Sequence, residues 1–379
     1  MGRMVTERAG GRVIAGRYRL HERLGRGGMG IVWRATDQLL GRQVAVKALP
    51  VDETLSAAEA GRRRERTLRE ARAVAQLSHP HVIVVHDVVE DDERAYMVME
   101  LVDGGSLADR VLSHGPVDAA EAARIGIALL DALRTAHAAG MLHRDVKPSN
   151  VLVAGDGRVV LTDFGVAQVA GATTLTETGS FVGSPEYTAP ERMSGAGTGP
   201  ESDLWSLGVL LCAILSGTSP FHRDSLGGIL HAVVTEEIHP PAQAGPILPV
   251  VRGLLERDPQ RRLDAGEAEQ MLRAFLATGR TPAPARTGEP RHVTKGVLMA
   301  VLLVVAAAGA GISAAALLAE EGGDGGGTPP SSAPVTSTEP TTPPASVTAS
   351  VTASPSVAPR RFPHPPPWLR PTPRPPQRT

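Results

Sequence analysis

The polar stretch His143–Asn150 constrains the fold of this chain more than any other part of its sequence. It carries a carboxylate at Asp145, a cation at Lys147 and a carboxamide at Asn150, and apolar residues flank it on both sides. Pro148 lies between these polar groups and forbids a regular helix or a central strand there. The pattern therefore predicts a polar loop held between two buried segments, where side chains can be fixed for chemistry.

A second motif, Asp163-Phe164-Gly165, follows a short β-branched run and is expected at the end of a strand. Together, H-R-D-x-K-x-x-N at 143–150 and D-F-G at 163–165 resemble the catalytic core of protein kinases. The resemblance covers Tyr18 to about Leu276. It implies an α+β fold with two lobes, in which a β-sheet with one helix forms the N-lobe and the C-lobe is mainly helical.

Asp145, Asn150 and Asp163 form a set of oxygen-bearing side chains. Hard oxygen ligands suit Mg²⁺, which prefers one or two carboxylates together with phosphate oxygens and water. Taken singly, each Asp is also compatible with a turn or cap residue, but the set in this order and spacing is not. The resemblance implies that Asn150 and Asp163 hold Mg²⁺, with Mn²⁺ as a substitute. It also implies that Asp145 accepts the proton of a substrate hydroxyl and that Lys147 steadies the γ-phosphate of ATP.

The glycine-rich stretch Leu24–Val32 is the first candidate for phosphate binding. A G-x-G-x-x-G pattern alone is weak evidence, and a dinucleotide site is the first alternative. That alternative requires a strand, a turn and a helix, whereas the residues after Gly30 are β-branched and alternating, which is typical of a strand. The strand–loop–strand pattern resembles the kinase glycine loop, in which backbone N–H groups approach phosphate oxygens closely.

Lys47 lies on a short apolar strand, and an inward-pointing lysine needs an anionic partner. The resemblance assigns it to the phosphates of ATP and to a glutamate on the next helix, predicted over 63–76. Glu70 shares one face of that helix with Ala71 and Val74, whereas Glu65 does not. Glu70 is therefore the predicted partner, with a solvated surface glutamate as the alternative.

The resemblance also places a hinge at Met99–Val102, where backbone groups of Glu100 and Val102 would meet the adenine ring. Plain core packing is the alternative for the apolar residues around it, and the sequence alone does not separate the two. The predicted nucleotide contacts are Leu24, Gly25, Gly27, Gly30, Val32, Ala45, Lys47, Met99, Glu100, Val102 and Leu152.

The Thr-, Ser- and Gly-rich segment 166–184 has no periodicity, and loops this long inside a domain are usually functional. Thr176 and Thr178 are predicted phosphorylation sites, because their spacing resembles that in the loops of bacterial Ser/Thr kinases. Arg144 is a cation that would receive such a phosphate. Ala-Pro-Glu closes the segment at Glu191, which by resemblance pairs with Arg262. Asp203, at the start of an apolar helix, would accept hydrogen bonds from the backbone of the catalytic loop.

Composition changes after residue 276. The segment 296–319 carries no charge, and at about 1.5 Å per residue a helix of that length spans the hydrocarbon core of a bilayer. Cations precede it and acids follow it, so the positive-inside rule places the kinase domain in the cytoplasm. The predicted organisation is a disordered N-terminus (1–17), a kinase domain (18–276), a juxtamembrane linker (277–295), a single transmembrane helix (296–319) and an extracytoplasmic Pro/Thr/Ser-rich tail (320–379).

These features together resemble the bacterial eukaryotic-type transmembrane Ser/Thr protein kinases. The implied function is ATP-dependent phosphorylation of Ser and Thr on proteins, including the enzyme's own activation loop, with dimerisation for phosphorylation in trans as a further expectation. A net charge of −1 gives no nucleic-acid signal. A membrane-bound pseudokinase that acts as a scaffold is the alternative function. The complete set of motif residues argues against it, and the Ala-Pro-Glu segment argues against a small-molecule kinase.

Overall fold

The computed structural model describes residues 11–27, 30–50, 56–92, 94–165, 184–195 and 197–284. The chain divides into two units, Met1–Glu321 and Gly322–Thr379, and every described residue belongs to the first. The predicted linker beyond 284, the predicted transmembrane helix 296–319 and the predicted tail lie outside the described residues. Within the described ranges, no helix combines the length and apolar character needed to cross a membrane.

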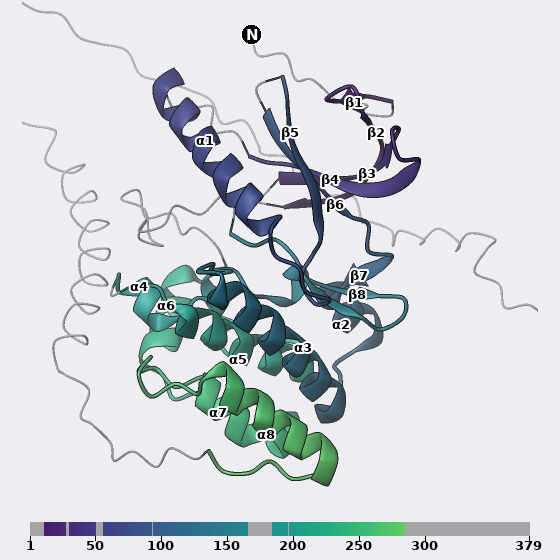
Figure 1. The fold of residues 1–379 in the computed structure, drawn as a ribbon. Coiled ribbons are helices and arrows are strands. Elements are labelled where there is room, and N and C mark those ends of the chain that lie inside the picture. Colours follow the sequence, from purple (N-terminus) through teal and green to yellow (C-terminus); the bar gives the residue numbers. More distant parts are fainter. Residues whose placement is uncertain are drawn as a thin grey trace, which may run out of the picture. The chain divides into compact units, whose positions relative to one another are not determined.

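The N-lobe is built on a six-stranded antiparallel sheet in the order β1-β2-β3-β4-β6-β5 (Figure 1). Its strands are β1 (Val13–Ile14), β2 (Tyr18–Gly27), β3 (Gly30–Asp37), β4 (Arg42–Ala48), β5 (Val85–Asp91) and β6 (Arg94–Glu100). Burial alternates along the second half of β3, as expected for a strand with one face on the core. The strand–loop–strand prediction for the glycine loop is therefore confirmed, because β2 and β3 pair up to Gly27 and Gly30.

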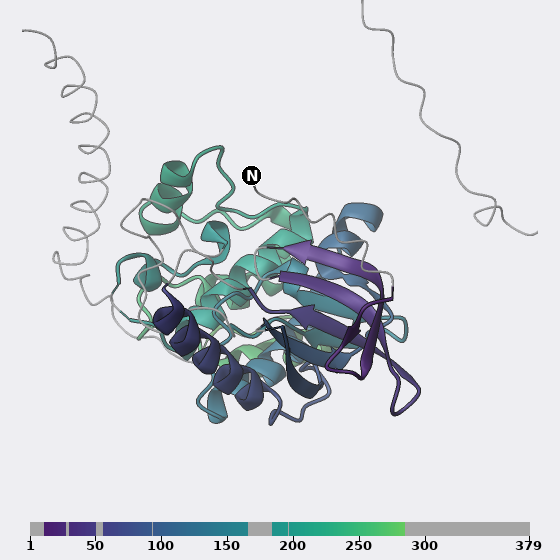
Figure 2. The same ribbon diagram turned by 90° about the horizontal axis from the view of Figure 1, so that it is seen from above.

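Helix α1 (Ala57–Val74) runs along this sheet (Figures 1 and 2). Ser56 caps it in a reciprocal capping box with Glu59, which satisfies donors at the helix start. Leu68, Ala71 and Val74 are buried against the lobe. The helix therefore begins six residues earlier than the sequence prediction of residue 63, because the capping signal at Ser56 extends it through an arginine-rich first part.

The sequence prediction of a disordered segment up to residue 17 is wrong for residues 11–17. Val13 and Ile14 pair with β2 as strand β1, and Ile14 is fully buried. Arg17 donates two hydrogen bonds to the buried carboxylate of Asp37, at 2.8 and 2.7 Å. The segment is thus held by one apolar side chain and by ion pairing to distant residues, neither of which a Gly-rich polar sequence signals. Residues 1–10 lie outside the described residues.

The C-lobe is mainly helical, as predicted. Its helices are α2 (Leu107–His114), α3 (Ala119–Ala138), α4 (Pro190–Met193), α5 (Pro200–Ser216), α6 (Leu226–Val234), α7 (Leu248–Leu254) and α8 (Ala265–Thr278), with 3-10 turns η1 (Pro148–Asn150), η2 (Pro185–Tyr187) and η3 (Ala242–Ile247). Helix α5 is apolar nearly all round, and its residues from 202 to 215 are all buried. A helix of this kind forms the centre of a core, and α3 and α7 pack against it.

A small sheet connects the lobes. Strands β7 (Gly104–Ser106), β8 (Val151–Ala154) and β9 (Val159–Leu161) pair in sequence order. The end of β9 reaches the N-lobe, where the Ile83 N–H donates to the Leu161 carbonyl at 3.0 Å and the Leu161 N–H donates to the His81 carbonyl at 2.8 Å. The polar loop His143–Asn150 lies between α3 and β8 and is therefore anchored between two buried elements, as the sequence predicts.

Candidate active site

The catalytic loop, residues 143–150, holds Asp145 in a buried position. Lys147 Nζ lies 2.7 Å from Asp145 Oδ2. The Asn150 amide nitrogen donates to the Asp145 carbonyl at 2.8 Å and to its Oδ2 at 3.0 Å. The structure thus brings three of the predicted active-site residues into direct contact, and it leaves the second carboxylate oxygen of Asp145 as the less occupied acceptor.

Asp203 of α5 lies beneath the catalytic loop, as the sequence predicts. Its two carboxylate oxygens accept hydrogen bonds from the backbone N–H groups of His143 at 2.9 Å and Arg144 at 2.7 Å. A third hydrogen bond joins it to the His137 ring at 2.8 Å. Burial would raise the pKa of the Asp203 carboxyl, but the hydrogen bonds from His137 and the His143 backbone hold that pKa below its usual range. The carboxylate is therefore a charged anchor for the loop.

His143 is fully buried and acts as a neutral ring within the loop. Its Nε2 lies 2.8 Å from the Thr162 carbonyl, and its Nδ1 accepts the Asp145 N–H at 3.2 Å. One nitrogen must carry a hydrogen and the other must not, which only the neutral tautomer provides. Burial accordingly lowers the pKa of the His143 ring. The ring also contacts Phe164, with 4.7 Å between ring centroids, and so connects the two motifs.

Two site residues adopt left-handed backbone conformations. Arg144 has φ +68° and Asp163 has φ +64°. For residues other than glycine such conformations cost roughly 1–3 kcal/mol and persist only where the surroundings enforce them. Here the enforcing contacts include the hydrogen bonds of Asp203 to the catalytic loop. Strain of this kind is concentrated at functional sites.

Lys47 is buried on β4, and its Nζ lies 2.8 Å from Asp163 Oδ1. The predicted ion pair of Lys47 with Glu70 is not formed in this structure. Glu70 instead accepts a hydrogen bond from Arg66, one helical turn earlier, at 3.0 Å.

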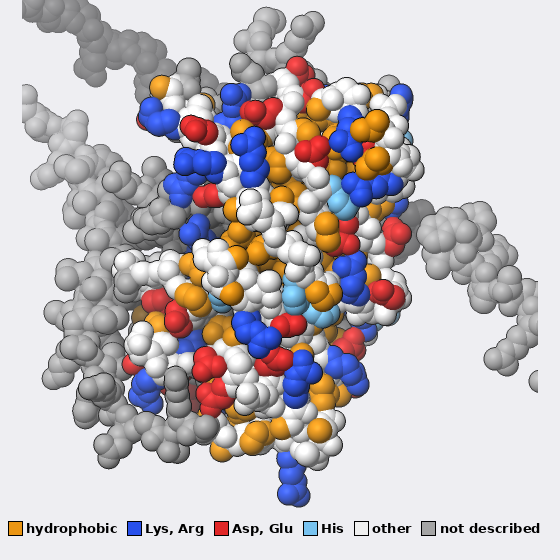
Figure 3. Space-filling view, in the orientation of Figure 1, with side chains coloured by type: hydrophobic (Ala, Val, Ile, Leu, Met, Phe, Trp, Pro, Cys, Tyr) orange, Lys and Arg blue, Asp and Glu red, His pale blue; other side chains and the backbone are white. Residues whose placement is uncertain are grey.

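The reason for this difference is local charge. Basic side chains gather around α1 (Figure 3), and the arginines of this helix at 62, 63, 64, 69 and 72 are exposed. Arg66 satisfies Glu70 within the helix, and Asp163 satisfies the buried ammonium of Lys47. A glutamate with a cation four residues away on its own helix has a partner without any tertiary contact.

The apolar residues predicted to hold adenine do come together. Ala45, Met99, Ile83 and Val160 form a buried cluster, against which Val32, Val102 and Leu152 pack. Five of the predicted nucleotide-contact residues therefore belong to one cluster, which draws on strands of both lobes. Leu24 is 44% exposed and does not belong to it.

Glu100 places its side chain away from this cluster, where it accepts hydrogen bonds from the Val84 N–H at 3.1 Å and from Arg158 at 2.8 Å. Arg158 also donates to the Pro80 carbonyl. Sequence reasoning assigned Glu100 through its backbone only and missed Arg158, which fastens the hinge to the β8–β9 turn.

The glycine loop is described up to Gly27 and from Gly30 onward. Gly30 has φ +119°, and a Cβ there would lie 2.0 Å from the Ala48 carbonyl oxygen. Only glycine fits such a position. A Cβ on Gly25 would meet no described atom within 4 Å, so the described part of the fold does not itself require glycine at this position.

The donor set at Asp163 and Asn150 fits Mg²⁺. Asn150 gives its amide nitrogen to Asp145, so the amide oxygen is the atom left for a cation. The Asn150 backbone carbonyl accepts the Thr162 N–H at 2.9 Å. Asp163 directly follows Thr162, so this hydrogen bond ties the start of the D-F-G motif to Asn150. In the described part of the chain, no three His, Cys, Asp or Glu side chains form a metal-binding group. One carboxylate with an amide oxygen suits Mg²⁺ that is bound chiefly through phosphates.

The residues that follow the predicted activation loop, the segment 166–184, are held by contacts with the C-lobe. Glu191 accepts hydrogen bonds from Arg262 at 2.8 and 3.0 Å, and the Arg262 side chain is fully buried, so the pair predicted from the sequence is present. Lys147 Nζ also contacts Ser184 Oγ at 2.8 Å. The predicted phosphorylation sites Thr176 and Thr178 lie outside the described residues.

Sequence reasoning missed Arg192, which follows Glu191 on α4. It donates a hydrogen bond to the Arg144 carbonyl. Sequence reasoning also missed His137, whose ring forms a hydrogen bond with Asp203. Both contacts join residues far apart in sequence, one of them through a backbone atom, and no local pattern marks such contacts.

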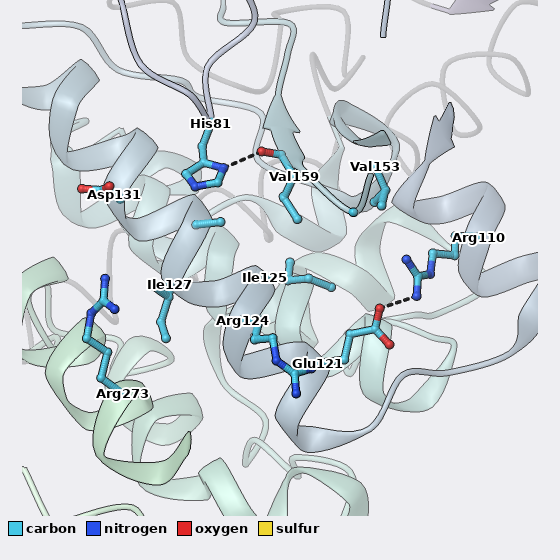
Figure 4. Close-up of a pocket in the computed structure, with 12 residues that line it drawn as sticks. His81, Arg110, Glu121, Arg124, Ile125, Ile127, Asp131, Val153, Val159 and Arg273 are labelled. Carbon is cyan, nitrogen blue, oxygen red and sulfur yellow. Dashed lines mark hydrogen bonds and ion pairs between the residues drawn. The ribbon is translucent and has the colours of Figure 1, made fainter. Parts of the chain in front are cut away.

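A separate cavity of about 460 Å³ lies on the outer side of α3 (Figure 4). Its lining residues include Ile125, Val159, Arg124 and Arg273, and none of the predicted site residues lines it. Arg110 and Glu121 pair at its edge (Figure 4). The cavity is therefore distinct from the motif residues between the lobes.

Comparison with known proteins agrees with this geometry. The family model described as "Protein kinase domain" matches residues 18–273. Serine/threonine-protein kinase PknA of Mycobacterium tuberculosis is 39% identical over 291 residues, which covers 74% of this chain and 66% of the relative. Serine/threonine-protein kinase PknE of Mycobacterium tuberculosis is 37% identical over 269 residues, with 69% and 47% covered. Probable serine/threonine-protein kinase PknB of Lactococcus lactis is 41% identical over 217 residues, with 57% and 34% covered.

The matched regions span just under two thirds of PknA and smaller shares of the other two relatives. The family model matches well over half of this chain and includes both the catalytic loop and the D-F-G motif. The chain therefore belongs to the protein kinase domain family, and bacterial serine/threonine-protein kinases are among its relatives.

Proposed function

We propose that this chain transfers the γ-phosphate of ATP to Ser and Thr hydroxyl groups of proteins. The observation that carries the proposal is the geometry around Asp145, a buried carboxylate held by Lys147 and Asn150 on a loop anchored to Asp203. The family membership supports the same reaction, as does the description of its relatives as serine/threonine-protein kinases.

Different residues of the chain would have different roles in the transfer. Asp145 would orient the substrate hydroxyl and accept its proton, for which a fixed carboxylate within hydrogen-bond reach is the requirement. Lys147, 2.7 Å from Asp145, would place positive charge beside the transferred phosphoryl group. The cluster around Ala45 and Met99 would exclude water from the adenine ring. Lys47 and the glycine loop would hold the phosphates.

Mg²⁺ on Asp163 and Asn150 would supply the charge that neutralises the phosphate oxygens during transfer. Lys47 pairs with Asp163 in this structure. The lysine must therefore exchange that partner for phosphate oxygens and Glu70 when nucleotide binds. The exchange requires Glu70 to leave Arg66.

Membrane anchoring and activation-loop autophosphorylation belong to the same proposal. The uncharged segment 296–319 would cross the membrane once, with the kinase domain in the cytoplasm and residues 320–379 outside. Phosphate on Thr176 or Thr178 would be received by Arg144, which adjoins Asp145. Phosphorylation between two copies of the chain in trans would account for the first activation event.

The test is phosphoryl transfer to protein by the full chain in detergent. The parent and an Asp145→Asn variant are incubated with Mg²⁺, γ-labelled ATP and casein, and the labelled amino acids are identified. We expect phosphoserine or phosphothreonine with the parent and a loss of at least about 10²-fold with the variant. Intact nucleotide binding without transfer by the parent would contradict the proposal and favour a scaffold function.

A further inference from the structure

Arg192 is a half-buried arginine that none of the sequence motifs uses. It lies on α4, directly after the Glu191 that pairs with Arg262. Its guanidinium reaches the catalytic loop and donates a hydrogen bond to the carbonyl oxygen of Arg144, the residue before Asp145. The contact joins two segments 48 residues apart in the sequence.

The backbone around Asp145 is fixed at each of its polar atoms. The Arg144 N–H donates to Asp203 at 2.7 Å, and the Arg144 carbonyl accepts from Arg192. The Asp145 N–H donates to His143 Nδ1 at 3.2 Å, and the Asp145 carbonyl accepts from Asn150 at 2.8 Å. A complete set of partners determines where the Asp145 carboxylate points.

Charge strengthens two of these contacts. An anion, Asp203, faces the N–H of Arg144, and a cation, Arg192, faces its carbonyl. Hydrogen bonds with one ionised partner are roughly twice as strong as neutral ones. Burial lowers the pKa of the Arg192 guanidinium, while nearby Asp203 and Asp145 favour its charged form. An arginine remains charged in proteins. The two charged contacts on the Arg144 peptide groups, from Asp203 and Arg192, form a clamp that keeps its charges.

The left-handed conformation of Arg144 explains why such a clamp is needed. With φ +68° and a side chain other than hydrogen, Arg144 would relax to a more common conformation if its peptide groups were released. That relaxation would rotate the following peptide and move Asp145. We propose that Arg192 is a positioning residue, which holds the Arg144 peptide and thereby aims Asp145 at the substrate hydroxyl. The inference rests on the proposed kinase function, but its structural part can be tested without it.

The experiment compares Arg192→Met, Arg192→Lys and a matched control, Arg257→Met, in the full chain. Arg257 is also a half-buried arginine that donates to backbone carbonyls, those of Val233, Ala232 and Glu236, and burial likewise lowers its pKa. It contacts α6 rather than the catalytic loop. Any loss common to both Met variants therefore reports removal of a buried arginine in general.

We expect Arg192→Met to lower kcat by about 10- to 100-fold, since a misplacement of about 1 Å can cost 10²-fold in rate. The KM for MgATP and the calorimetric Kd for MgADP should stay within about threefold, because the hydrogen bond of Arg192 goes to the Arg144 carbonyl, which is not a predicted nucleotide contact. Arg192→Lys should recover part of kcat, since an ammonium can donate to one carbonyl although it lacks the planar fork. Arg257→Met should keep kcat.

Hydrogen exchange separates this inference from the proposed function. Peptides covering 141–152 should exchange faster in Arg192→Met than in the parent and at the parent's rate in Arg257→Met. If the parent transfers no phosphate, the proposed function fails while exchange still tests the clamp. Unchanged exchange with kcat within twofold of the parent in Arg192→Met, or an equal loss of kcat in Arg257→Met, would overturn the inference.

Discussion

The two sides of the candidate active site are built differently. On the C-lobe side, Asp145 lies on a loop whose backbone is fixed by Asp203, Arg192 and Asn150. On the N-lobe side, Lys47 and Glu70 each have a partner, but not each other. The contrast teaches that Asp145 is held in place by several fixed contacts, whereas Lys47 and Glu70 are held by ion pairs that, under the proposed function, exchange when nucleotide binds.

The largest structural effect is expected where the C-lobe side is broken by Arg262→Met. Its side chain is fully buried, and its loss would leave Glu191 without its cation. Breaking a buried pair costs about 3–5 kcal/mol, which for a domain of this size lowers Tm by about 10 °C. Thermal unfolding measures the change. Arg261→Met is the control, since Arg261 only approaches Glu256 to 4.0 Å at the surface and should shift Tm little. Equal Tm shifts in the two variants would show that the buried pair of Glu191 and Arg262 does not stabilise the fold more than a surface contact does.

A smaller effect is expected on the N-lobe side from Arg66→Gln. Removing the arginine frees Glu70 for Lys47 and should raise the initial rate of phosphorylation. A half-exposed pair four residues apart is worth about 0.3–0.5 kcal/mol, so we expect about a twofold increase. Arg69→Gln removes a neighbouring exposed arginine that carries no ion pair to Glu70 and should leave the rate unchanged. A fall in rate with Arg66→Gln would mean that Arg66 supports the active arrangement instead of competing with it.

The smallest effect concerns pH and the neutral ring of His143. Burial lowers its pKa in the folded state. The stability it contributes is therefore complete above the unfolded-state pKa, near 6.5, and is lost as the pH falls toward the lower folded-state pKa. Between pH 7.5 and 5.5 we expect the parent to lose a few degrees more in Tm than His143→Gln, which keeps a donor for Thr162. His239→Gln, at an exposed position, should behave as the parent does. An identical pH dependence in all three proteins would mean that the His143 ring is not held neutral.

Much of the C-lobe side was predictable from the sequence. The loop at His143–Asn150, the pair of Glu191 with Arg262 and the anchoring role of Asp203 follow from motifs that the structure brings together. In each case the motif specifies a charged or amide side chain at a fixed position, and few other functions would require that residue type there. The helical C-lobe was predictable from the resemblance, and the strand–loop–strand at the glycine loop from the alternating β-branched residues after Gly30.

The rest depended on tertiary distances that no pattern encodes. Glu70 has Arg66 on its own helix and Lys47 on a strand, and the sequence shows both cations without showing which is nearer. Arg192 acts on a backbone carbonyl, which every residue possesses. Strand β1 is held by the buried side chain of Ile14 and by the hydrogen bonds that Arg17 donates to Asp37. A short polar segment gives no sequence signal for either contact.

Mass spectrometry of the full chain after incubation with MgATP, beside its Asp145→Asn variant, tests the central claim most directly. The account predicts phosphate on Thr176 or Thr178 of the parent, with a loss of at least about 10²-fold in the variant, because the preformed Asp145 carboxylate is required. Equal phosphorylation of both proteins, or an unmodified parent that still binds nucleotide, would contradict it.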